Sequence, residues 1–491
     1  MRGDAIPYIA MIKPAIAGIL RRARYATVAA ALLTALIGCN QTITSNPIVV
    51  YYSGSINVNF NWIGGVPDCV ECAQTYVTVY TSEMGDFNYG PFTFSYDGVY
   101  LSQVLGGHNR IFTIWVTDNA GDTLYRGVLS DVHITSGVEN PSVTVDIYGK
   151  GWYTLSVSQP SASWGLDKVR MSGDGSGWIA GSDNLGDHGV IFRGGNDIWA
   201  LDSLQVSSSN YWALRSVVPS GDGAWAVGED KQHGSGIILR NDGTIWHDDV
   251  TEPVVPGPWR LNGVDMIADI AGWAVGESES STPESGVVLQ YDQSGWTLYG
   301  PLNLPNCAFN DIAAISTAEF IIGGEDKSAS TGFVLDWRMG NTITYTPAAM
   351  GDCTGEWAIK DVYAVEASDW WAAGSCDNGG GSTFGLAFHY TSASGEMLRQ
   401  TISGITGNWT LEGIWADASG EAWAVGNTPT AAVILRLSGG EWSQVTPLMP
   451  PGDSLSWSLQ SVDFPATGWG YAAGTDLTNN RGIILRYGFP K

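Results

Sequence analysis

The sequence predicts an all-β protein in which an N-terminal β-sandwich precedes a seven-bladed β-propeller of four-stranded blades. Short runs that alternate apolar and polar residues dominate the chain after the first forty residues, and no long stretch has the 3.6-residue period of a helix. A motif built on tryptophan and glycine also returns at a nearly constant interval. Such an interval is typical of repeat architectures.

The first 38 residues have the features of a signal peptide. Four basic residues between positions 13 and 24 precede the apolar run Ala26–Ile37. The run ends in "LIGC", which resembles the lipobox of bacterial lipoproteins, and the resemblance implies that Cys39 becomes the lipidated first residue. A transmembrane anchor is the alternative, but the run is too short to span a bilayer. Asn40 implies outer-membrane sorting by the same resemblance. We therefore expect a signal peptide over 1–38, a lipidated linker over 39–47 and a cell-envelope location.

The charge of the chain restricts its partners. The formal net charge is −26, from 49 acidic and 23 basic residues. Such a surface repels phosphate backbones and anionic lipid, so nucleic-acid binding is excluded as a function. Cationic proteins, divalent ions and neutral polysaccharides remain compatible with this charge as partners.

Residues 46–148 form a separate predicted unit. Runs such as "SINVNFNW", "QTYVTVYT" and "SVTVDIYG" alternate apolar and polar residues, and "DNAGD" is a hairpin-like turn. About a hundred residues of this kind make a β-sandwich, which resembles the immunoglobulin-like or transthyretin-like spacers of bacterial lipoproteins. We expect this unit to hold the propeller away from the membrane.

Five cysteines remain besides Cys39. Cys69 and Cys72 have the spacing of a redox pair or half a zinc site, but no second ligand pair lies nearby, and a disulfide is favoured for an exported chain. Cys353 and Cys376 are predicted to form a second disulfide in the fifth blade, which leaves Cys307 unmatched.

The propeller, residues 151–491, is predicted from seven copies of one motif. The glycine that closes "WAVG" or its variants recurs at Gly181, Gly228, Gly276, Gly324, Gly374, Gly426 and Gly474, with spacings of 47, 48, 48, 50, 52 and 48. A β-branched landmark recurs in step at Val169, Val217, Val264, Ile312, Val362, Ile414 and Val462, five residues after an aromatic except in the fourth copy. A period near 48 residues with four strands is the signature of a propeller blade.

The ends of the repeat predict how the ring closes. The last copy lacks a fourth strand, and "GWYTLSV", which begins at Gly151, supplies a matching one. We therefore expect Trp152 to Val157 to be the outermost strand of blade seven, which removes the open edges of the ring.

Most of the 22 tryptophans recur by blade and are predicted to pack between sheets. A role in stacking on sugars is open only to those outside the repeat, which are Trp62, Trp115, Trp337, Trp370, Trp415 and Trp469.

The blade pattern resembles known repeat families. The turns in "LRNDGTIW" and "LRLSGGEW" resemble weakened Asp-box (BNR) hairpins of sialidase-like proteins. The glycine-Trp-Ala-Val-Gly second strand is similar to that of photosystem II stability/assembly factor-like propellers. The likeness covers residues 151–491 and implies the architecture rather than a ligand, because propellers host unrelated functions.

Catalytic motifs are sparse. The chain has no G-x-S-x-G, no H-E-x-x-H and no P-loop, and its six histidines lack ligand spacing. No metal site is assigned. Paired carboxylates for glycoside hydrolysis stay open because acids are abundant.

Residues that vary inside the repeat are the better candidates for function. Those flanking the landmark are expected to face the central channel if the first strands are innermost, and the candidates are Arg170, Asp265, Asp311, Asp361, Tyr363, Trp415 and Asp463. The alternative is that they form hydrogen bonds between blades, since a buried carboxylate is costly unless paired.

A second candidate surface is an acidic crown on one face, at the ends of the second strands. It comprises Asp183, Glu229, Asp230, Glu277, Glu325, Asp326, Asp377 and Asp476. The crown could attract Ca²⁺ or a basic partner, or consist of ordinary solvated loop charge.

The sequence thus favours a lipid-anchored, non-catalytic envelope protein whose propeller presents a loop face to a protein or glycan. An exported carbohydrate-active enzyme that uses channel carboxylates is the alternative. An assembly factor for a membrane complex is implied only by the family resemblance.

Overall fold

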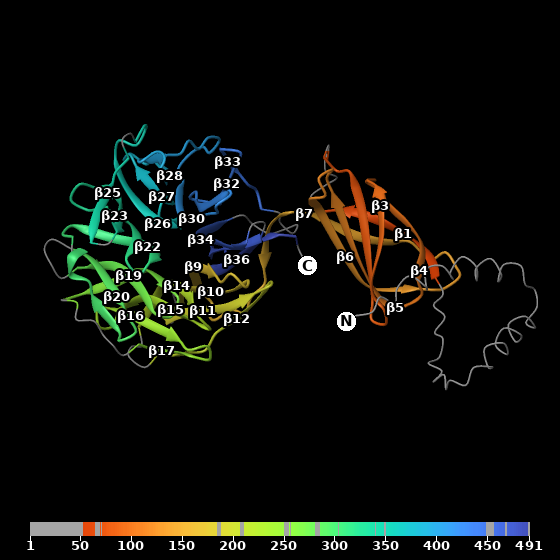
Figure 1. The fold of residues 1–491 in the computed structure, drawn as a ribbon, viewed down its shortest axis with the longest axis horizontal. Helices are drawn as coiled ribbons and strands as arrows, with labels where there is room; N and C mark the ends of the chain where they lie inside the picture. The colour runs from red at the N-terminus through yellow and green to blue at the C-terminus, as the bar shows by residue number, and fades with distance from the viewer. Residues whose placement is uncertain are drawn as a thin grey trace, which may run out of the picture.

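The chain folds as a β-propeller with a smaller β-domain beside it (Figure 1). The structure is a computed structural model. It describes residues 53–489, apart from 64–68, 70, 184–187, 207–210, 250–254, 256, 280–284, 303, 339, 348–349, 448–455 and 467–468. The predicted signal peptide and Cys39 lie outside the described residues.

The N-terminal domain is one hydrogen-bonded sheet of seven strands in the order β3-β2-β5-β6-β7-β1-β4. The strands are β1 (Ser53–Trp62), β2 (Gln74–Thr81), β3 (Gly85–Thr93), β4 (Gly98–Leu105), β5 (Gly107–Thr117), β6 (Thr123–Ile134) and β7 (Val143–Gly149). Alternate residues of these strands are buried in a single core that includes Val58, Val79 and Ile114.

This sheet differs from the expected two-sheet sandwich in one respect. Its four-stranded part, β3-β2-β5-β6, and its three-stranded part, β7-β1-β4, are joined by three residue pairs between β6 and β7. A Cβ on Gly127, which pairs with Ile147, would lie 2.6 Å from the Asp146 carbonyl oxygen. Glycine at this position therefore lets the two strands approach closely and the sheet continue around one side of the core.

The seven-bladed propeller is confirmed, with four strands in six of the blades and a fifth, short strand in the second. The first strands are β9 (Trp164–Met171), β14 (Trp212–Ser220), β18 (Trp259–Ile267), β22 (Cys307–Ser316), β26 (Glu356–Glu366), β30 (Thr410–Ala416) and β34 (Trp457–Ala466). The second strands are β10 (Ser176–Asp183), β15 (Gly223–Asp230), β19 (Ala271–Ser278), β23 (Glu319–Asp326), β27 (Asp369–Asp377), β31 (Ala422–Asn427) and β35 (Trp469–Asp476).

The outer strands complete the blades. The third strands are β11 (His188–Gly195), β16 (Ser235–Asn241), β20 (Ser285–Tyr291), β24 (Thr331–Arg338), β28 (Thr383–Thr391), β32 (Ala432–Ser438) and β36 (Arg481–Gly488). The fourth strands of the first six blades are β12 (Ile198–Leu201), β17 (Trp246–Asp248), β21 (Trp296–Leu298), β25 (Asn341–Tyr345), β29 (Met397–Arg399) and β33 (Glu441–Gln444). The additional strand β13 (Leu204–Gln205) pairs with β17, and a 3₁₀ turn, η1, spans Gly300–Leu302.

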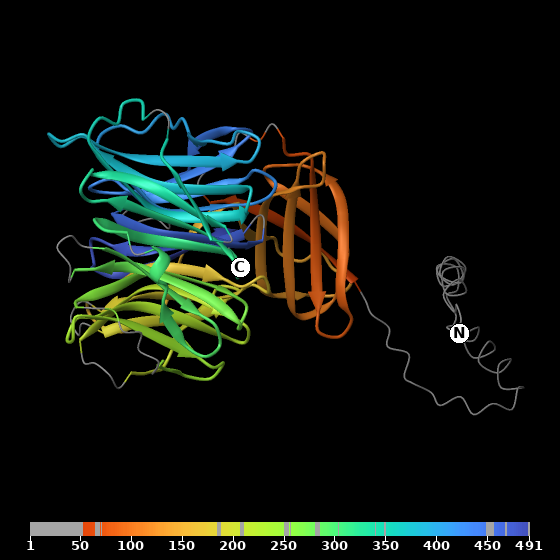
Figure 2. The same cartoon turned by 60° about the vertical axis from the view of Figure 1, so that its left-hand side comes forward.

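The fourth strand of the last blade comes from the start of the repeat region. Strand β8 (Gly151–Leu155) pairs antiparallel with β36, with Trp152 opposite Tyr487, and stops two residues short of the predicted Val157. Only Lys150 separates β8 from β7, so the N-terminal domain lies beside the blade that contains β36 (Figures 1 and 2).

Each first strand contains a β-bulge at the same place. The pairing with the second strand skips one residue, two positions before the β-branched landmark, in all seven blades. In the third blade the skipped residue is Asn262, between Leu261 and Gly263. A bulge places two consecutive side chains on nearly the same side of the strand. The bulges therefore direct additional side chains into the central channel.

The bulge explains the glycine of the "WAVG" motif. A Cβ on Gly276 would lie 1.9 Å from the Arg260 carbonyl oxygen, and one on Gly228 would lie 1.9 Å from that of Ala213. A Cβ added to any of the other five motif glycines would lie 2.3 Å or less from the corresponding carbonyl oxygen. Only glycine leaves room for the backbone of the bulged first strand.

The tryptophan of the motif packs against the third strand. The Arg193 guanidinium lies 4.8 Å from the centre of the Trp178 ring, and Arg240 lies 5.1 Å from that of Trp225. In both cases the two residues are cross-strand partners. Trp178 and Trp225 are thus held by cation–π contacts as well as by burial.

The part of the chain that the structure describes contains no helix with the length and apolar character required to cross a membrane.

Candidate functional site

The central channel has two openings, which are lined by different positions of the first strands. The residue that each bulge leaves unpaired is called the bulge residue. Bulge residues and some of the residues that follow them line an opening of about 190 Å³ on the face where the first strands begin. We call this opening the crown mouth, because the crown residues end the second strands on the same face. Residues after the landmark line a wider opening of about 490 Å³ at the other end, which we call the cup.

A buried lysine lies between the two openings. The Nζ atom of Lys168 is 3.1 Å from Oδ2 of Asp311 and 2.5 Å from Oδ1 of Asp361. Burial opposes the charge of Lys168, but the two carboxylates raise its pKa above the ordinary value. Burial raises the pKa of Asp361 despite this cation. For Asp311 burial also acts to raise the pKa, but Lys168, the hydrogen bond with Asp361 and Arg170 together lower it.

The channel carboxylates also connect neighbouring blades. Asp361 accepts a hydrogen bond from the Ile414 amide at 2.6 Å, and Asp311 accepts one from the Val362 amide at 3.3 Å. At the cup, Asp265 accepts from Ala314 at 2.7 Å and Asp463 accepts from Met171 at 2.6 Å. Each acceptor therefore fixes the backbone of the next blade around the ring, which satisfies a buried charge that would otherwise be costly.

Arg170 is the cation of the cup. Its guanidinium nitrogen lies 3.7 Å from Oδ2 of Asp265, and its Cζ lies 5.8 Å from the centre of the Tyr363 ring. Burial opposes its charge, but Asp265 and Asp463 raise its pKa above the ordinary value. For both carboxyl groups burial has the larger effect and raises the pKa, and Arg170 opposes it. Burial likewise raises the pKa of Tyr363.

Six of the seven predicted channel residues lie at these openings, and Trp415 does not. Its side chain is 3% exposed and packs in the core of the last two blades, 4.7 Å from the ring of Phe464. The equivalent residues of the other six blades line the cup, whereas at this position the large tryptophan ring fills space between blades.

The bulge residues are functional candidates that the sequence reasoning missed. They are Asp167, Arg215, Asn262, Asn310, Lys360, Glu412 and Gln460, and all seven line the crown mouth. The sequence contains a pattern that marks them, because each bulge residue is polar or charged and directly follows an apolar residue of the first strand. Some have structural partners, since Asn310 donates to the Ile359 carbonyl oxygen at 2.6 Å and Arg215 pairs with Glu229 at 3.2 Å.

Two acids of the crown mouth have altered acidity. Asp167 reaches solvent, but the walls of the mouth exclude part of its water and raise its pKa, against the effect of Arg215. Burial also raises the pKa of Glu412, although Thr410 and Lys360 oppose the shift. The mouth thus combines cations, acids and amides in a small opening.

The acidic crown does not form one site in the structure. Four of its aspartates accept hydrogen bonds from backbone amides two residues ahead and so cap the turn that follows the second strand, namely Asp230, Asp326, Asp377 and Asp476. Asp183 accepts from the Ser161 hydroxyl at 2.8 Å. Glu277 is 3% exposed and pairs with Arg260 and Lys327.

Glu325 lines a separate cavity of about 400 Å³ with Glu356 and Asp377. Within the described ranges, no group of three or more histidine, cysteine or acidic side chains has an arrangement that could hold a metal ion.

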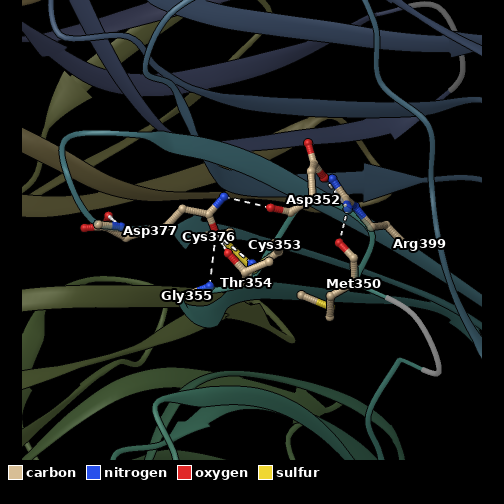
Figure 3. The surroundings of a disulfide bond; sticks show 10 residues. Met350, Asp352, Cys353, Thr354, Gly355, Cys376, Asp377 and Arg399 are labelled. Atoms are coloured by element: carbon tan, nitrogen blue, oxygen red, sulfur yellow. Dashed lines mark hydrogen bonds and ion pairs between the residues drawn. A yellow bond between two sulfur atoms is a disulfide. The ribbon is translucent and has the colours of Figure 1, made fainter.

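The cysteines form two disulfides in the structure. One joins Cys69 to Cys72, and the other joins Cys353 to Cys376. Figure 3 shows the second disulfide with Thr354 and Gly355 beside it. The Thr354 and Gly355 amides donate hydrogen bonds to Asn378 at 2.7 and 3.0 Å. Cys307 is a buried free thiol, and burial raises its pKa to about 11.

Comparison with known proteins relates the chain only to solved structures. No known protein family matches it, and no curated protein does. It is similar to YCF48 from Cyanidioschyzon merolae at 15% identity and a TM-score of 0.46, over 69% of this chain and 98% of that chain. It is also similar to a structure described as YCF48 bound to D1 peptide, at 16% identity and a TM-score of 0.47, over 69% of this chain and 97% of that chain.

Proposed function

We propose that the protein is a non-catalytic binding scaffold whose crown mouth recognises a polar segment of a partner protein. The observation that carries the proposal is the set of seven bulges, which direct seven polar or charged side chains into one opening. A mouth with cations, acids and amides complements a protein loop that presents polar side chains and backbone groups.

The channel carboxylates support a structural role over a catalytic one. Asp311 and Asp361 share Lys168 and accept backbone hydrogen bonds from the next blade. Asp265 and Asp463 accept backbone hydrogen bonds in the same manner. A general acid or base has to be able to exchange its proton with substrate, and acceptors engaged in this way are poorly placed to do so.

The proposal is tested by capture from envelope extract with two matched variants. The mouth variant carries Asp167→Asn, Lys360→Gln and Glu412→Gln, and the cup variant carries Tyr363→Phe. We expect a protein that wild type retains to be lost by the mouth variant and kept by the cup variant. If both variants retain the same proteins as wild type, the crown mouth is not the binding site.

We further propose that the chain is an outer-membrane lipoprotein anchored through Cys39, with the N-terminal domain as a spacer. The lipobox-like sequence and the two disulfides, which persist in oxidising compartments, support this location. Cys39→Ser should abolish palmitate labelling. Labelling that persists in the variant would contradict the anchor.

A carbohydrate-active enzyme is the second candidate, because Asp265 and Asp463 line the same cup beside Tyr363 and burial raises the pKa of both. Two carboxyl groups at one opening are what glycoside hydrolysis requires. This function predicts glycan turnover that is lost in Asp265→Asn and Asp463→Asn. Turnover that survives both changes removes the enzyme from consideration.

A further inference from the structure

A further cavity lies where the N-terminal domain meets the propeller, away from both channel openings. It has a volume of about 400 Å³, within the range of small-molecule sites. Trp115 of β5 and Arg126 of β6 line one side, and Trp469, Tyr471 and Arg486 of the last blade line the other. We call it the interdomain pocket.

The interdomain pocket carries an uncompensated positive charge in a strongly acidic protein. Arg486 forms an ion pair with Asp197. Arg126 has no ion-pair partner within the described residues, and its buried Nε has no hydrogen-bond partner there. Burial, and then the charge of Arg486, lower the pKa of Arg126, against the effect of Asp197. An anion between the two guanidinium groups would relieve this repulsion.

Aromatic rings surround the cations. The Cζ atom of Arg126 lies 4.8 Å from the centre of the Trp115 ring. Trp469 and Tyr471 meet edge to face with their centroids 6.0 Å apart. Among the six tryptophans outside the repeat, only Trp115 and Trp469 are incompletely buried within the described structure, and both line this pocket. Such rings offer an apolar surface for the CH face of a pyranose ring.

The walls of the pocket are held in place before any ligand binds. The Asp197 amide donates to the Tyr471 hydroxyl at 3.1 Å, and that hydroxyl donates to the Asp197 carboxylate at 3.4 Å. Lys150 is the single residue between β7 and β8, so the two domains cannot separate far at this point. A site formed in advance loses less conformational entropy on binding.

We propose that the interdomain pocket binds a carboxylate-bearing sugar of the uronate class. The carboxylate pairs with Arg126, whose guanidinium suits bidentate recognition of carboxylates, and the sugar ring lies against Trp115 and Trp469. The pocket is thus a glycan site that is independent of the protein-binding crown mouth.

The test is calorimetric titration of the full chain with glucuronate, with glucose and inorganic phosphate as comparison ligands. We expect glucuronate to bind at least about tenfold more tightly than glucose or phosphate, because the charged pair and the aromatic surfaces both contribute. Arg126→Gln and Trp469→Ala should each weaken glucuronate binding by about tenfold. Arg193→Gln is the matched control, since Arg193 also lies 4.8 Å from a tryptophan ring but is not among the residues that line the interdomain pocket.

Three results would overturn the proposal. Equal affinity for glucose and glucuronate would remove the role of the carboxylate. Phosphate binding as tight as glucuronate binding and insensitive to Trp469→Ala would indicate a simple anion site. An Arg126→Gln variant that melts like wild type and keeps its affinity would exclude Arg126. The mouth variant should bind glucuronate normally, so failure at one site is distinguishable from failure at the other.

Discussion

Lys168 and Asp361 are 193 residues apart in the sequence, yet their Nζ and Oδ1 atoms lie 2.5 Å apart in the centre of the ring. The lysine belongs to the first blade and the aspartate to the fifth, and Asp311 of the fourth blade completes the group. The contact exists only when the blades have closed into a ring. It therefore reports on the assembly of the whole propeller.

Replacing Lys168 by methionine should destabilise the propeller. The change leaves two buried carboxyl groups without their cation, and breaking a buried pair costs about 3–5 kcal/mol. The folded-state pKa values of the carboxyl groups then rise. The loss in free energy of unfolding is therefore full at pH values above them and shrinks as the pH falls toward 4. Denaturant unfolding at pH 5 and pH 8 measures both effects. Lys360→Met, at the crown mouth, is the control and should cost much less.

Gly276→Ala should destabilise the third blade. The added Cβ would meet the Arg260 carbonyl oxygen at 1.9 Å, and backbone rather than a flexible side chain would have to move. Overpacking of this kind costs about 1–3 kcal/mol. Gly300→Ala is the matched control, because a Cβ added there would have nothing within 4 Å of it. Equal melting temperatures for the two variants would contradict the role of the bulge.

Thiol counting should separate the cysteines into three groups. The full chain has six, of which four are in disulfides in the structure and Cys307 is a free thiol. If Cys39 is lipidated, the membrane-extracted protein should show one reactive thiol when denatured without reductant and five after reduction. Two thiols before reduction would indicate an unmodified Cys39. More than two would contradict a disulfide.

The Asp242 turn should contribute to stability in a pH-dependent way. Hydrogen bonds from the Thr244 hydroxyl, and then from the Thr244 and Ile245 amides, lower the pKa of Asp242 from 3.8 to about 2. A depressed folded-state pKa gives a contribution that is present above the unfolded value and is lost as the pH falls through about 2. The difference in melting temperature between wild type and Asp242→Asn should therefore shrink between pH 4 and pH 2. The difference in melting temperature between wild type and Thr244→Val should change less over the same pH interval.

The repeat made the propeller predictable, whereas the channel contacts depend on ring geometry. A constant period and recurring glycines define the blades, and residues flanking the landmark could be assigned to the channel. The partners of Lys168 could not, because they depend on which blades face one another across a closed ring. Trp415 was misplaced for a related reason, since its position in one strand does not show how the neighbouring blade packs on it.

The bulge residues were missed because a regular strand alternates its sides with period 2. That rule puts Lys360 and Asp361 on opposite faces, but the bulge brings both to the crown mouth. A polar residue directly after an apolar one, repeated in seven blades, is the sequence pattern that identifies such a bulge. The cavity between domains had no sequence signal, because it depends on how separately folded parts meet.

The strand that completes the last blade is also the strand by which the N-terminal domain is attached. Tension applied from the N-terminal side would pass through β7 and Lys150 directly to β8, which is held by its pairing with β36 and by the buried Trp152. A mechanical load applied from that side would thus act on the seam of the ring before it reached any other blade. Pulling experiments should find that this seam sets the force at which the propeller opens.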